Sequence, residues 1–561
     1  MNPLGLRRSW RHLNRYQEIL KVFVKYGFYD IVEKIRVGLL FDISKKILPR
    51  LEKKELATLG TAVRLRMALE ELGPTFIKLG QMLSIRPDLI PPHIADEFSK
   101  LQDEVRPVSF DVVKPYIEAE LGNSLTDLFS EFNQDAIAAA SLAQVHWAKL
   151  KSGEEVAVKI LRPNIQHVIE TDLEILYDLA RLLEKHIPES ELYDPIGIVN
   201  EFSTTIRKEQ NMIFEGRNID LFRRHFKDDP TIKLPIVYWE LTTEKILVTE
   251  YIKGIKISEI EILEKQEINL KEVANNGAQL ILKMVFECGV FHADPHPGNI
   301  FVLPENVLAP VDFGMVGRID EEMKECLVNI LRGIVDKDTH RISRTLLKIG
   351  MIEDQIDRRK LNRELLEFLD RYYRIPLNQL STPQLLNEFL VLIRNFRIKL
   401  PSDLVMMGKA LAISEGVGRK IYPEFNMFEL IVPYSEKLLL HRLDPFYQFK
   451  NFSRFMETGI DFLGNLPDDF RLILTKLKKD QITIKFQHQG LEHLTRELDR
   501  ASNRLAFSLI IAALLIGSSM LIQFNKGPFL FGYPALGIIG FLLASFMGIW
   551  LLISIMRSGK L

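Results

Sequence analysis

The sequence predicts an α+β fold followed by a hairpin of two apolar helices. Apolar, β-branched stretches such as EVAVKIL and EKILVTEYI lie within residues 111–255, and their composition is typical of buried strands. Helical periodicity dominates residues 1–110 and 256–440. Two long uncharged runs follow near the C-terminus, and each is long enough to cross a bilayer.

These changes in composition divide the chain into five expected parts. With 561 residues, of which 47% are hydrophobic, it can bury a large core. The expected parts are a helical extension (1–110), a mixed lobe (111–255), a helical lobe (256–440), a juxtamembrane region (441–504) and two transmembrane helices (505–561). Within the fourth part, QITIKFQH alternates like a short strand and LEHLTRELDRASNR is typical of a charged helix.

Charge and cysteine content exclude several classes of protein. Lys and Arg number 73 and Asp and Glu 74, for a net charge of -1, so we expect no nucleic-acid partner. Cys288 and Cys326 are the two cysteines. They are too few for a disulfide framework or a four-cysteine zinc site, which fits a reducing compartment.

The C-terminal apolar runs predict an integral membrane protein. Leu505 to Phe524 and Phe529 to Met556 are joined by a link containing NKGP, which is typical of a turn. The flanking basic residues are Arg496, Arg500, Arg504, Arg557 and Lys560. They place both ends of the hairpin, and the preceding chain, on the cytoplasmic side of the cell membrane. A buried hairpin in a soluble domain is the alternative.

Small residues in the apolar runs predict close helix packing. Gly517, Gly537, Gly540 and Gly548 would let two helices approach closely. This approach can occur within one chain or between copies, which leaves a homodimer open.

The segment GVFHADPHPGNIFVLPENVLAPVDFG, residues 289–314, holds the candidate site. Asp294 and Asn299 are five positions apart, and Asp312-Phe313-Gly314 begins thirteen positions after Asn299. These spacings match the catalytic loop and D-F-G motif of protein kinases, which predicts a two-lobed protein-kinase-like fold. Asp312 and Asn299 would bind Mg²⁺ through oxygen, and Asp294 would orient the attacking hydroxyl or water.

The same segment allows a rival interpretation as a transition-metal site. His292, Asp294 and His296 alternate along the chain, so an extended backbone would present them on one face as ligands. The kinase interpretation also accounts for Asn299 and Asp312. It further predicts that NIFVL and VLAPVDFG form a β-hairpin that fixes both Mg²⁺ ligands.

Upstream residues complete a predicted ATP site. Lys159 lies in the buried strand EVAVKIL, where an ammonium needs a carboxylate partner. Glu215, in the helix-like segment FSTTIRKEQNMIFEGRN, is the expected partner, and Lys159 would contact the α and β phosphates. In AAASLAQVHW, alanine stands where a glycine-rich loop would lie, so the grip on phosphate is expected to differ. The expected nucleotide-contacting residues are Ala138, Ala139, Ala140, Ser141, Ala143, Val145, Lys159, Glu215, Glu250 and Tyr251.

With these motifs in order, the sequence resembles the UbiB-like atypical kinases. FIKLGQ supplies that family's K-x-G-Q motif at Lys78, Gly80 and Gln81. The resemblance implies that the N-terminal extension covers the substrate site and that Lys78 and Gln81 face an E-x-D element with a regulatory role. This element corresponds to Glu209 and Asn211, and Asn211 departs from the pattern by lacking the carboxylate.

The function follows from this resemblance and from what the kinase motifs lack. Ala293 replaces the catalytic-loop arginine, and no A-P-E motif or long activation loop follows Gly314, so phosphorylation of proteins in trans is doubtful. The resemblance implies an Mg²⁺-dependent ATPase or atypical kinase that supports isoprenoid quinone biosynthesis. Its partners would be polyprenylated membrane lipids and quinone-biosynthesis enzymes. A regulatory protein kinase and a nucleotide-gated scaffold without turnover are the alternatives.

Overall fold

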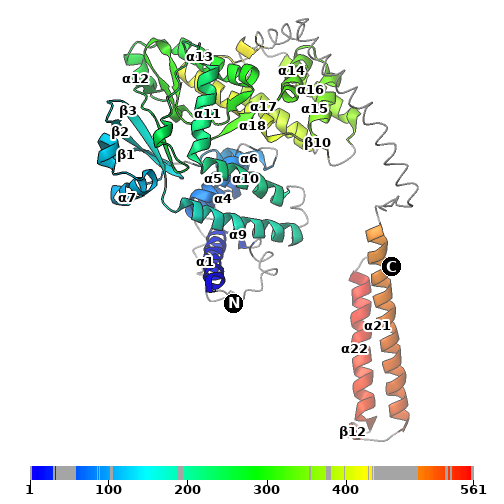
Figure 1. Ribbon diagram of the computed structural model, residues 1–561. Coiled ribbons are helices and arrows are strands. Elements are labelled where there is room, and N and C mark those ends of the chain that lie inside the picture. Colours follow the sequence, from blue (N-terminus) through cyan, green and yellow to red (C-terminus); the bar gives the residue numbers. More distant parts are fainter. Residues whose placement is uncertain are drawn as a thin grey trace, which may run out of the picture. The chain divides into compact units, whose positions relative to one another are not determined.

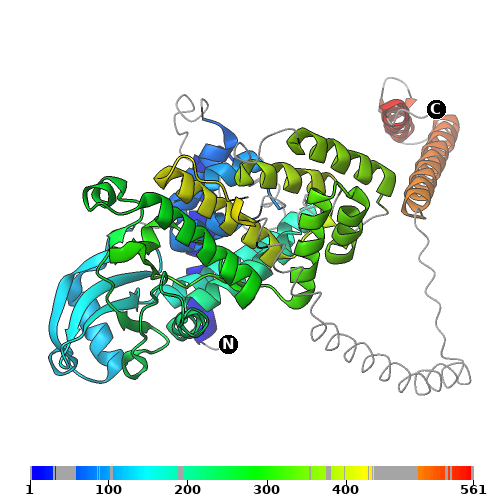
Figure 2. The same ribbon diagram turned by 90° about the horizontal axis from the view of Figure 1, so that it is seen from above.

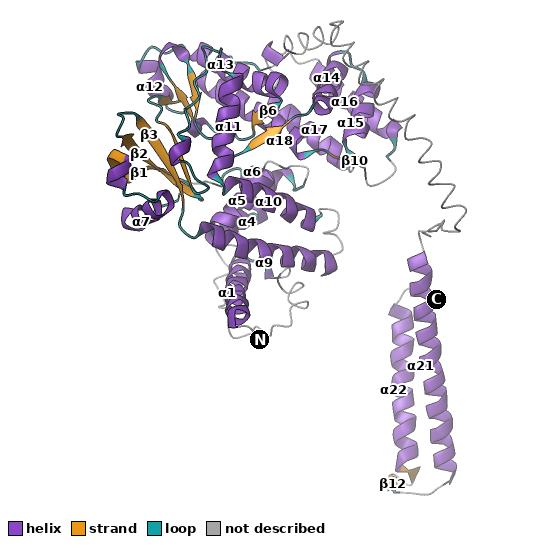
Figure 3. Cartoon of the chain, viewed as in Figure 1, coloured by secondary structure: helices purple, strands orange, loops and turns teal. Residues whose placement is uncertain are grey.

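The computed structural model divides into two compact units, residues 1–448 and 449–561. It describes residues 3–29, 32, 59–84, 86, 89–101, 105–186, 194–352, 356–373, 381–396, 398–427, 429–431, 434, 491–524, 528–530 and 533–557. Helices predominate, and the longer strands gather in one sheet (Figure 3). The finer division at residues 110, 255, 440 and 504 stays a prediction.

A four-stranded antiparallel sheet forms the mixed lobe. Its strands, in order, are β1 (Phe129–Ala139), β2 (Ala143–Leu150), β3 (Glu155–Leu161) and β4 (Ile246–Glu250). Alternate residues of β3, including Val156, Val158 and Ile160, are fully buried. They pack with α7 (Phe110–Leu121) and α8 (Leu125–Leu128) in one apolar cluster. Lys159 therefore points to the opposite face, because side chains alternate along a strand.

Three helices connect β3 to β4. They are α9 (Ile165–His186), α10 (Pro195–Glu209) and α11 (Met212–His225). The sequence FSTTIRKEQNMIFEGRN was expected to form one helix, but it divides between α10 and α11. The break occurs because Asn211 adopts an extended conformation and its side chain accepts a hydrogen bond from Ile213 N, which caps α11.

Short antiparallel strands also occur in the helical lobe. Strands β5 (Ile255–Lys256), β7 (Ile300–Val302) and β8 (Leu308–Pro310) form one sheet, and β6 (Val290–His292) pairs with β9 (Val316–Arg318). The predicted hairpin after Asn299 is confirmed, since β7 and β8 are antiparallel with Ile300 opposite Pro310. The remaining helical segments here are α12 (Ile260–Lys265), α13 (Leu270–Lys283), a π-helical turn (Met284–Cys288) and short 3-10 turns, including Pro297–Asn299.

Among the described residues, five longer helices complete this lobe. They are α14 (Glu321–Val335), α15 (Thr339–Ile349), α16 (Arg358–Tyr373), α17 (Thr382–Asn395) and α18 (Ser402–Ile421). Helices α14 to α17 lie at the end opposite the β1–β4 sheet, whereas α18 runs back along α13 (Figure 2). A two-residue pair, β10 (Met351–Ile352) with β11 (Ile398–Lys399), links them. Helices α15 to α17 share a separate apolar core around Leu361, Leu365 and Phe368, whereas α18 also contributes to the main core.

The N-terminal extension packs on the helices that follow β3 (Figure 1). Its helices are α1 (Pro3–Lys25), α4 (Thr61–Leu72), α5 (Pro74–Ser84) and α6 (Pro92–Phe98). Arg15 of α1 forms an ion pair of 2.8 Å with the buried Asp172 of α9. Arg86, which follows α5, contacts Glu201 of α10 and Ser402 of α18. The extension is thereby joined to both lobes.

The second unit is a helical hairpin. Helix α21 (Leu491–Phe524) and helix α22 (Ala535–Arg557) pack along each other, with the short strands β12 (Phe529–Leu530) and β13 (Tyr533–Pro534) between them. Each of the two helices contains a segment that is long and apolar enough to span a membrane, Ala501–Gln523 in α21 and Ala535–Leu552 in α22. The charged segment 491–504 continues into the first apolar helix without a break. The strand expected at 481–488 lies outside the described residues.

Of the four glycines expected to aid packing, Gly537 and Gly540 lie at the contact between the two helices. A Cβ at Gly537 would lie 2.6 Å from Ile522 Cγ1, and one at Gly540 would collide with Ser518. A Cβ at Gly517 or Gly548 would meet nothing within 4 Å. Gly537 and Gly540 thus allow the two helices to approach, as expected for small residues in apolar hairpins.

Candidate active site

Lys159, Glu215 and Asp312 come together from three separate elements. Lys159 Nζ on β3 lies 2.6 Å from Glu215 Oε1 on α11 and 3.2 Å from Asp312 Oδ2, shortly after β8. Glu215 is therefore the partner of Lys159 in the structure. The ammonium joins the two lobes of the fold. In protein kinases, this lysine–glutamate pair and the D-F-G aspartate must both be in place for phosphoryl transfer.

Within this cluster, the opposite charges of Lys159 and Asp312 each favour the ionised form of the other. Burial by itself would lower the pKa of Lys159, but the carboxylates of Asp312 and Glu215 outweigh it and hold that pKa above its ordinary value. Burial would raise the pKa of Asp312, but the charge of Lys159 and the N–H of Gly314 hold that pKa well below its ordinary range. Asp312 is consequently ionised at neutral pH, the state that a metal ligand requires.

Packing around Phe313 sets the position of Asp312. The fully buried Phe313 ring lies 5.0 Å from the ring of Phe222 on α11 and 5.5 Å from the ring of His292. Asn218 Nδ2 also donates to Phe313 O at 3.1 Å. Helix α11 therefore positions both Glu215 and the D-F-G segment.

The catalytic loop presents Asp294 and Asn299 between β6 and β7. His296 Nδ1 accepts from Gly298 N at 3.1 Å and thereby caps the turn that carries Asn299. Within the described chain, neither the side-chain amide of Asn299 nor the Asp294 carboxylate has a hydrogen-bond partner. The ionised carboxylate of Asp312 and the side-chain amide oxygen of Asn299 form a set of oxygen ligands that suits Mg²⁺. The residues present thus fit an Mg²⁺–ATP site.

The transition-metal alternative does not match this geometry. The described residues contain no group of three or more His, Cys, Asp and Glu side chains that could hold a metal. The oxygen set around Asp312 remains the better metal site.

The alanine segment is a tight β-hairpin rather than an extended loop. Ala138 and Ala139 belong to β1, and Ala143 and Val145 to β2, with Val145 directly opposite Lys159. In the turn between them, Ala140 N donates to Ala143 O at 2.8 Å, and Ser141 is fully buried. No residue from 138 to 143, all of which are described, has a positive φ.

Arg162 holds this turn through two hydrogen bonds. Its Nε donates to Ala140 O at 3.0 Å, and its backbone N donates to Leu142 O at 2.9 Å. Ala140 N and the carbonyl oxygens of Ala140 and Leu142 are therefore already engaged in hydrogen bonds within the protein. The expected difference in phosphate binding from a glycine-rich loop stays a prediction.

The last residue of β4 and the residue that follows it lie where the two lobes join. The Glu250 carboxylate pairs with Lys233, and Tyr251 N donates to Glu155 O at 3.0 Å. Both residues lie at the lobe junction, but these groups are already engaged within the protein. Their predicted contact with nucleotide stays a prediction.

The K-x-G-Q residues lie on α5, as the helical periodicity predicts. Lys78 Nζ lies 3.7 Å from Glu209 Oε2, at the end of α10. Gln81 Nε2 instead donates to Leu101 O at 3.2 Å, so this amide does not reach the E-x-D element. Gly80 is buried where an added Cβ would lie 2.8 Å from Leu69 Cδ1 and collide with Leu101.

The third position of the E-x-D element has a structural use. The Asn211 side-chain oxygen accepts from Ile213 N at 3.0 Å and caps α11. This side-chain oxygen is thus engaged in the helix cap. A carboxylate at this position could cap the helix equally well.

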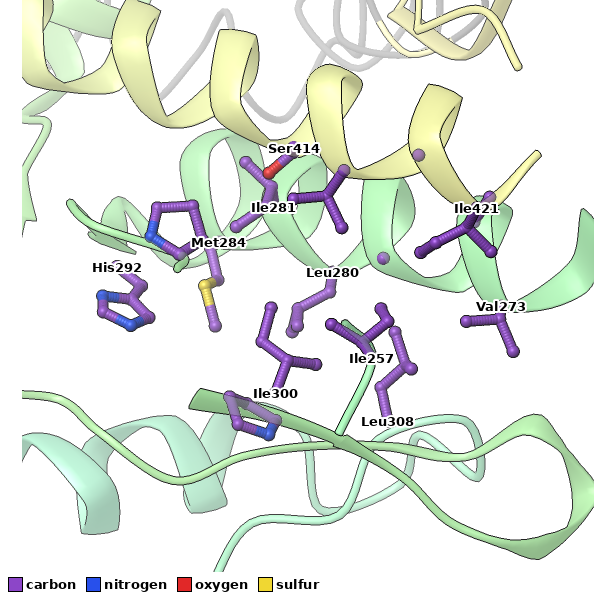
Figure 4. Close-up of a pocket in the computed structure, with 16 residues that line it drawn as sticks. Ile257, Val273, Leu280, Ile281, Met284, His292, Ile300, Leu308, Ser414 and Ile421 are labelled. Carbon is purple, nitrogen blue, oxygen red and sulfur yellow. The ribbon is translucent and has the colours of Figure 1, made fainter. Parts of the chain in front are cut away.

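Sequence motifs did not reveal two features beside the site. One is an apolar pocket behind the catalytic loop, between α13, α18 and the β7–β8 hairpin, with His292 and Ser414 among its lining (Figure 4). The other is Lys409 of α18, whose Nζ donates to Ser84 Oγ on α5 at 3.1 Å. Neither belongs to a local motif, because the contributing residues are far apart in the chain.

The fold and site define an atypical protein-kinase-like protein, and comparison with known proteins agrees. Residues 100–346 match the ABC1 atypical kinase-like domain. Residues 365–426 match the UbiB helical domain, and residues 489–557 the ABC1/UbiB kinase-like C-terminal domain. The chain belongs to the UbiB-like atypical kinase family.

Similar proteins match over nearly the whole chain. An uncharacterized protein in the hydrogenase 1 5′ region of Clostridium pasteurianum is 34% identical over 550 residues, which cover 98% of this chain and 99% of that protein. The probable protein kinase UbiB of Aliivibrio fischeri (strain ATCC 700601 / ES114) is 33% identical over 530 residues, with 91% and 94% covered. The solved structure of Rv3197 with erythromycin, from Mycobacterium tuberculosis, is 23% identical, covers 65% of this chain and 96% of its own, and has a TM-score of 0.44.

Proposed function

We propose that this protein is a membrane-anchored, Mg²⁺-dependent ATPase or atypical kinase that supports isoprenoid quinone biosynthesis. The observation that carries the proposal is the Lys159–Glu215–Asp312 cluster, with an ionised Asp312 and an uncommitted Asn299 near it in the fold. The names of relatives such as the probable protein kinase UbiB support the kinase-like class, and membership of the family supports the quinone pathway.

Each residue of the site has a distinct task in this proposal. Mg²⁺ bound with ATP supplies positive charge against the phosphates. Asp312 and Asn299 would hold the metal, and Lys159 would contact the phosphates while Glu215 fixes its position. Asp294 would orient an attacking hydroxyl or water. Phosphoryl transfer depends chiefly on such positioning and on charge stabilisation.

The C-terminal hairpin supports action at a membrane. Its two apolar segments are largely exposed, since only 6% and 11% of their apolar stretches are buried in the structure. A bilayer would cover such surfaces. Basic residues at both ends favour a cytoplasmic kinase-like unit. We infer that polyprenylated quinone precursors, which partition into the bilayer, are acted on or extracted there and passed to quinone-biosynthesis enzymes.

The fate of the γ-phosphate tests this function. Detergent-purified full-length protein is incubated with Mg²⁺ and γ-labelled ATP, with and without a polyprenyl-phenol lipid. Asp312→Asn removes the expected metal ligand, and Asp228→Asn is a control at an exposed aspartate on the same unit. We expect free phosphate or labelled lipid that increases with the lipid, is lost in Asp312→Asn and is unchanged in Asp228→Asn.

Other outcomes would select the alternatives. Label on a partner protein, lost in Asp294→Asn, would identify a protein kinase. Nucleotide binding without any release or transfer of phosphate, in every lipid condition, would identify a nucleotide-gated scaffold and contradict the proposal.

A further inference from the structure

Helix α18 brings a lysine to the catalytic loop. Asp403, in its first turn, accepts from Arg318 N of β9 at 3.0 Å, and β9 pairs with β6, the strand that leads directly to Asp294. Further along α18, Ser414 lines the same pocket as Pro295, the residue after Asp294. Lys409 lies between these two contacts on α18, which therefore runs beside the catalytic loop.

Three elements surround the Lys409 ammonium. Its Nζ donates to Ser84 Oγ on α5, and Ser84 Oγ in turn donates to Gln81 O at 2.7 Å. The acidic side chains whose charges act on it are Asp294 of the catalytic loop and Asp96 of α6. Lys409 thus lies where the extension, the catalytic loop and α18 meet.

Lys409 lacks the carboxylate partner that the other lysines of this region have. Lys159 pairs with Glu215 and Asp312, and Lys78 lies 3.7 Å from Glu209. Among the described residues, no carboxylate lies within ion-pairing distance of Lys409 Nζ. Burial lowers the pKa of Lys409 to about 8, although Asp294 and Asp96 oppose that shift.

A half-buried ammonium with only a hydroxyl partner is energetically costly. Such a cost is typical of a group that binds an anion from outside the protein. The catalytic loop itself offers no Lys or Arg between Asp294 and Asn299. Its His296 is used in the turn beside Asn299. Phosphoryl transfer nevertheless requires positive charge near the transferred group.

We propose that Lys409 contacts the terminal phosphate of a bound nucleoside triphosphate next to Asp294 and is a catalytic residue supplied by the helical domain. The inference rests on the proposed function and assigns the cation at the transferred group. Lys409 keeps its proton throughout. The attacking oxygen bonds to the γ-phosphorus while the bond to the bridging oxygen breaks. Its electron pair stays on the departing nucleoside diphosphate, and the displaced proton passes to Asp294 or solvent.

Nucleotide affinity tests this role without requiring turnover. Dissociation constants for Mg²⁺ with a non-hydrolysable ATP analogue, and for Mg²⁺ with ADP, are measured on the full-length protein. The variants are Lys409→Met, Lys409→Gln and Lys409→Arg, with Lys420→Met as a control at an exposed lysine of the same helix. Thermal unfolding of each variant checks that it folds.

If Lys409 contacts the γ-phosphate, its neutral variants should lose affinity for the ATP analogue but not for ADP. We expect Lys409→Met and Lys409→Gln to lower the affinity for the ATP analogue by at least roughly tenfold, the effect typical of losing a hydrogen bond to a charged group. The affinity for ADP should stay nearly unchanged. Lys409→Arg keeps most of the preference, and Lys420→Met keeps all of it. If both neutral variants bind the two nucleotides as the parent does, or weaken both equally, Lys409 does not contact the γ-phosphate.

Two further measurements distinguish phosphate binding by Lys409 from a packing role and from turnover itself. If Lys409 only docks α5 onto α18, Ser84→Ala will reproduce the Lys409→Met result, and the proposal is wrong. Turnover of the parent protein is assayed separately with labelled ATP. Absence of turnover with an intact Lys409-dependent preference for ATP would refute the ATPase while leaving the contact established.

Discussion

At the scale of single residues, the site depends on one buried ammonium shared by two carboxylates. Lys159 is 21% exposed and Glu215 only 6% exposed at their side chains. An ion pair so far removed from water adds little net stability, but the loss of one partner leaves an uncompensated charge. Lys159 is therefore needed for the fold around the site, in addition to the phosphate contact that we propose for it.

We predict that Lys159→Met lowers the free energy of unfolding by about 3 kcal/mol, because Glu215 and Asp312 would lose their shared cation. The double variant Lys159→Met/Glu215→Gln should regain part of that loss, since one buried charge is removed. Urea unfolding followed by intrinsic fluorescence measures both variants. Equal stability of Lys159→Met and the parent would show that the pair has no structural role.

The lowered pKa of Lys409 predicts opposite effects of pH on stability and on turnover. The folded protein disfavours charged Lys409, so this residue destabilises below pH 8, and the cost is relieved as pH rises from about 8 toward the unfolded pKa of about 10.4. Turnover should decline over the same range, because Lys409 loses the charge that faces Asp294 and Asp96.

Lys409→Arg provides the control for this pH dependence. Arginine stays charged throughout the range, so the decline in ATP turnover above about pH 8 should disappear in the variant. The measurement is kcat/KM against pH for both proteins, because this ratio reports the pKa values of the nucleotide-free enzyme. A decline of the same size and midpoint in Lys409→Arg would assign the titration to another group.

At the scale of elements, the junction between α10 and α11 holds the site together. Glu209 ends α10 and pairs with Lys78, while Asn211 caps α11, the helix that positions Glu215. The E-x-D element is therefore a helix break whose two ends serve different contacts.

We predict that Asn211→Ala lowers the free energy of unfolding by about 1 kcal/mol, since an N-cap hydrogen bond is lost. Asn211→Asp should stay close to the parent, because a carboxylate can accept the same bond from Ile213 N. Chemical denaturation compares the two variants. A larger loss in Asn211→Asp than in Asn211→Ala would mean that added charge at this position matters more than the cap.

The close packing of α5 against α4 and Leu101 explains the glycine of the K-x-G-Q motif. Gly80→Ala would push a methyl group into Leu101 and Leu69, whereas Gly416→Ala on α18 meets nothing within 4 Å. Both changes gain helix propensity, so their difference isolates packing. We expect Gly80→Ala to be less stable than Gly416→Ala by about 1–3 kcal/mol. Equal shifts in the unfolding midpoint would contradict this interpretation.

At the scale of the whole molecule, the kinase-like unit and the apolar hairpin each form their own compact body. The hairpin helices bury little surface within the structure. The kinase-like unit has its own cores, so we expect it to fold without the hairpin.

We predict that a chain ending at residue 490 keeps its basal ATP turnover but loses stimulation by polyprenyl-phenol lipid, because the surface that we propose contacts the membrane is removed. Phosphate release is measured in matched detergent and vesicle preparations. Full stimulation of the shortened chain would place lipid recognition in the kinase-like unit, where the apolar pocket near Ser414 would be the first region to examine.

The sequence by itself determined the chemistry of the site and the order of its parts. The spacing of Asp294, Asn299 and Asp312 is local, since one β-hairpin connects these residues, and the apolar runs of the hairpin are evident from composition alone. Lys159 and Glu215 could be paired because a buried ammonium requires a carboxylate. In each case, the physical constraint acts within a short segment or on a single residue.

Only the tertiary structure decided the contacts between distant segments. It divided the expected single helix at Asn211, directed Gln81 to Leu101 rather than to the E-x-D element, and brought Lys409 of α18 to Ser84 and the catalytic loop. These contacts depend on how helices pack, and packing depends on shape complementarity among residues that no local pattern relates. Lys409 belongs to no local motif, and the role that we propose for it rests on its burial and on the charges around it in the fold.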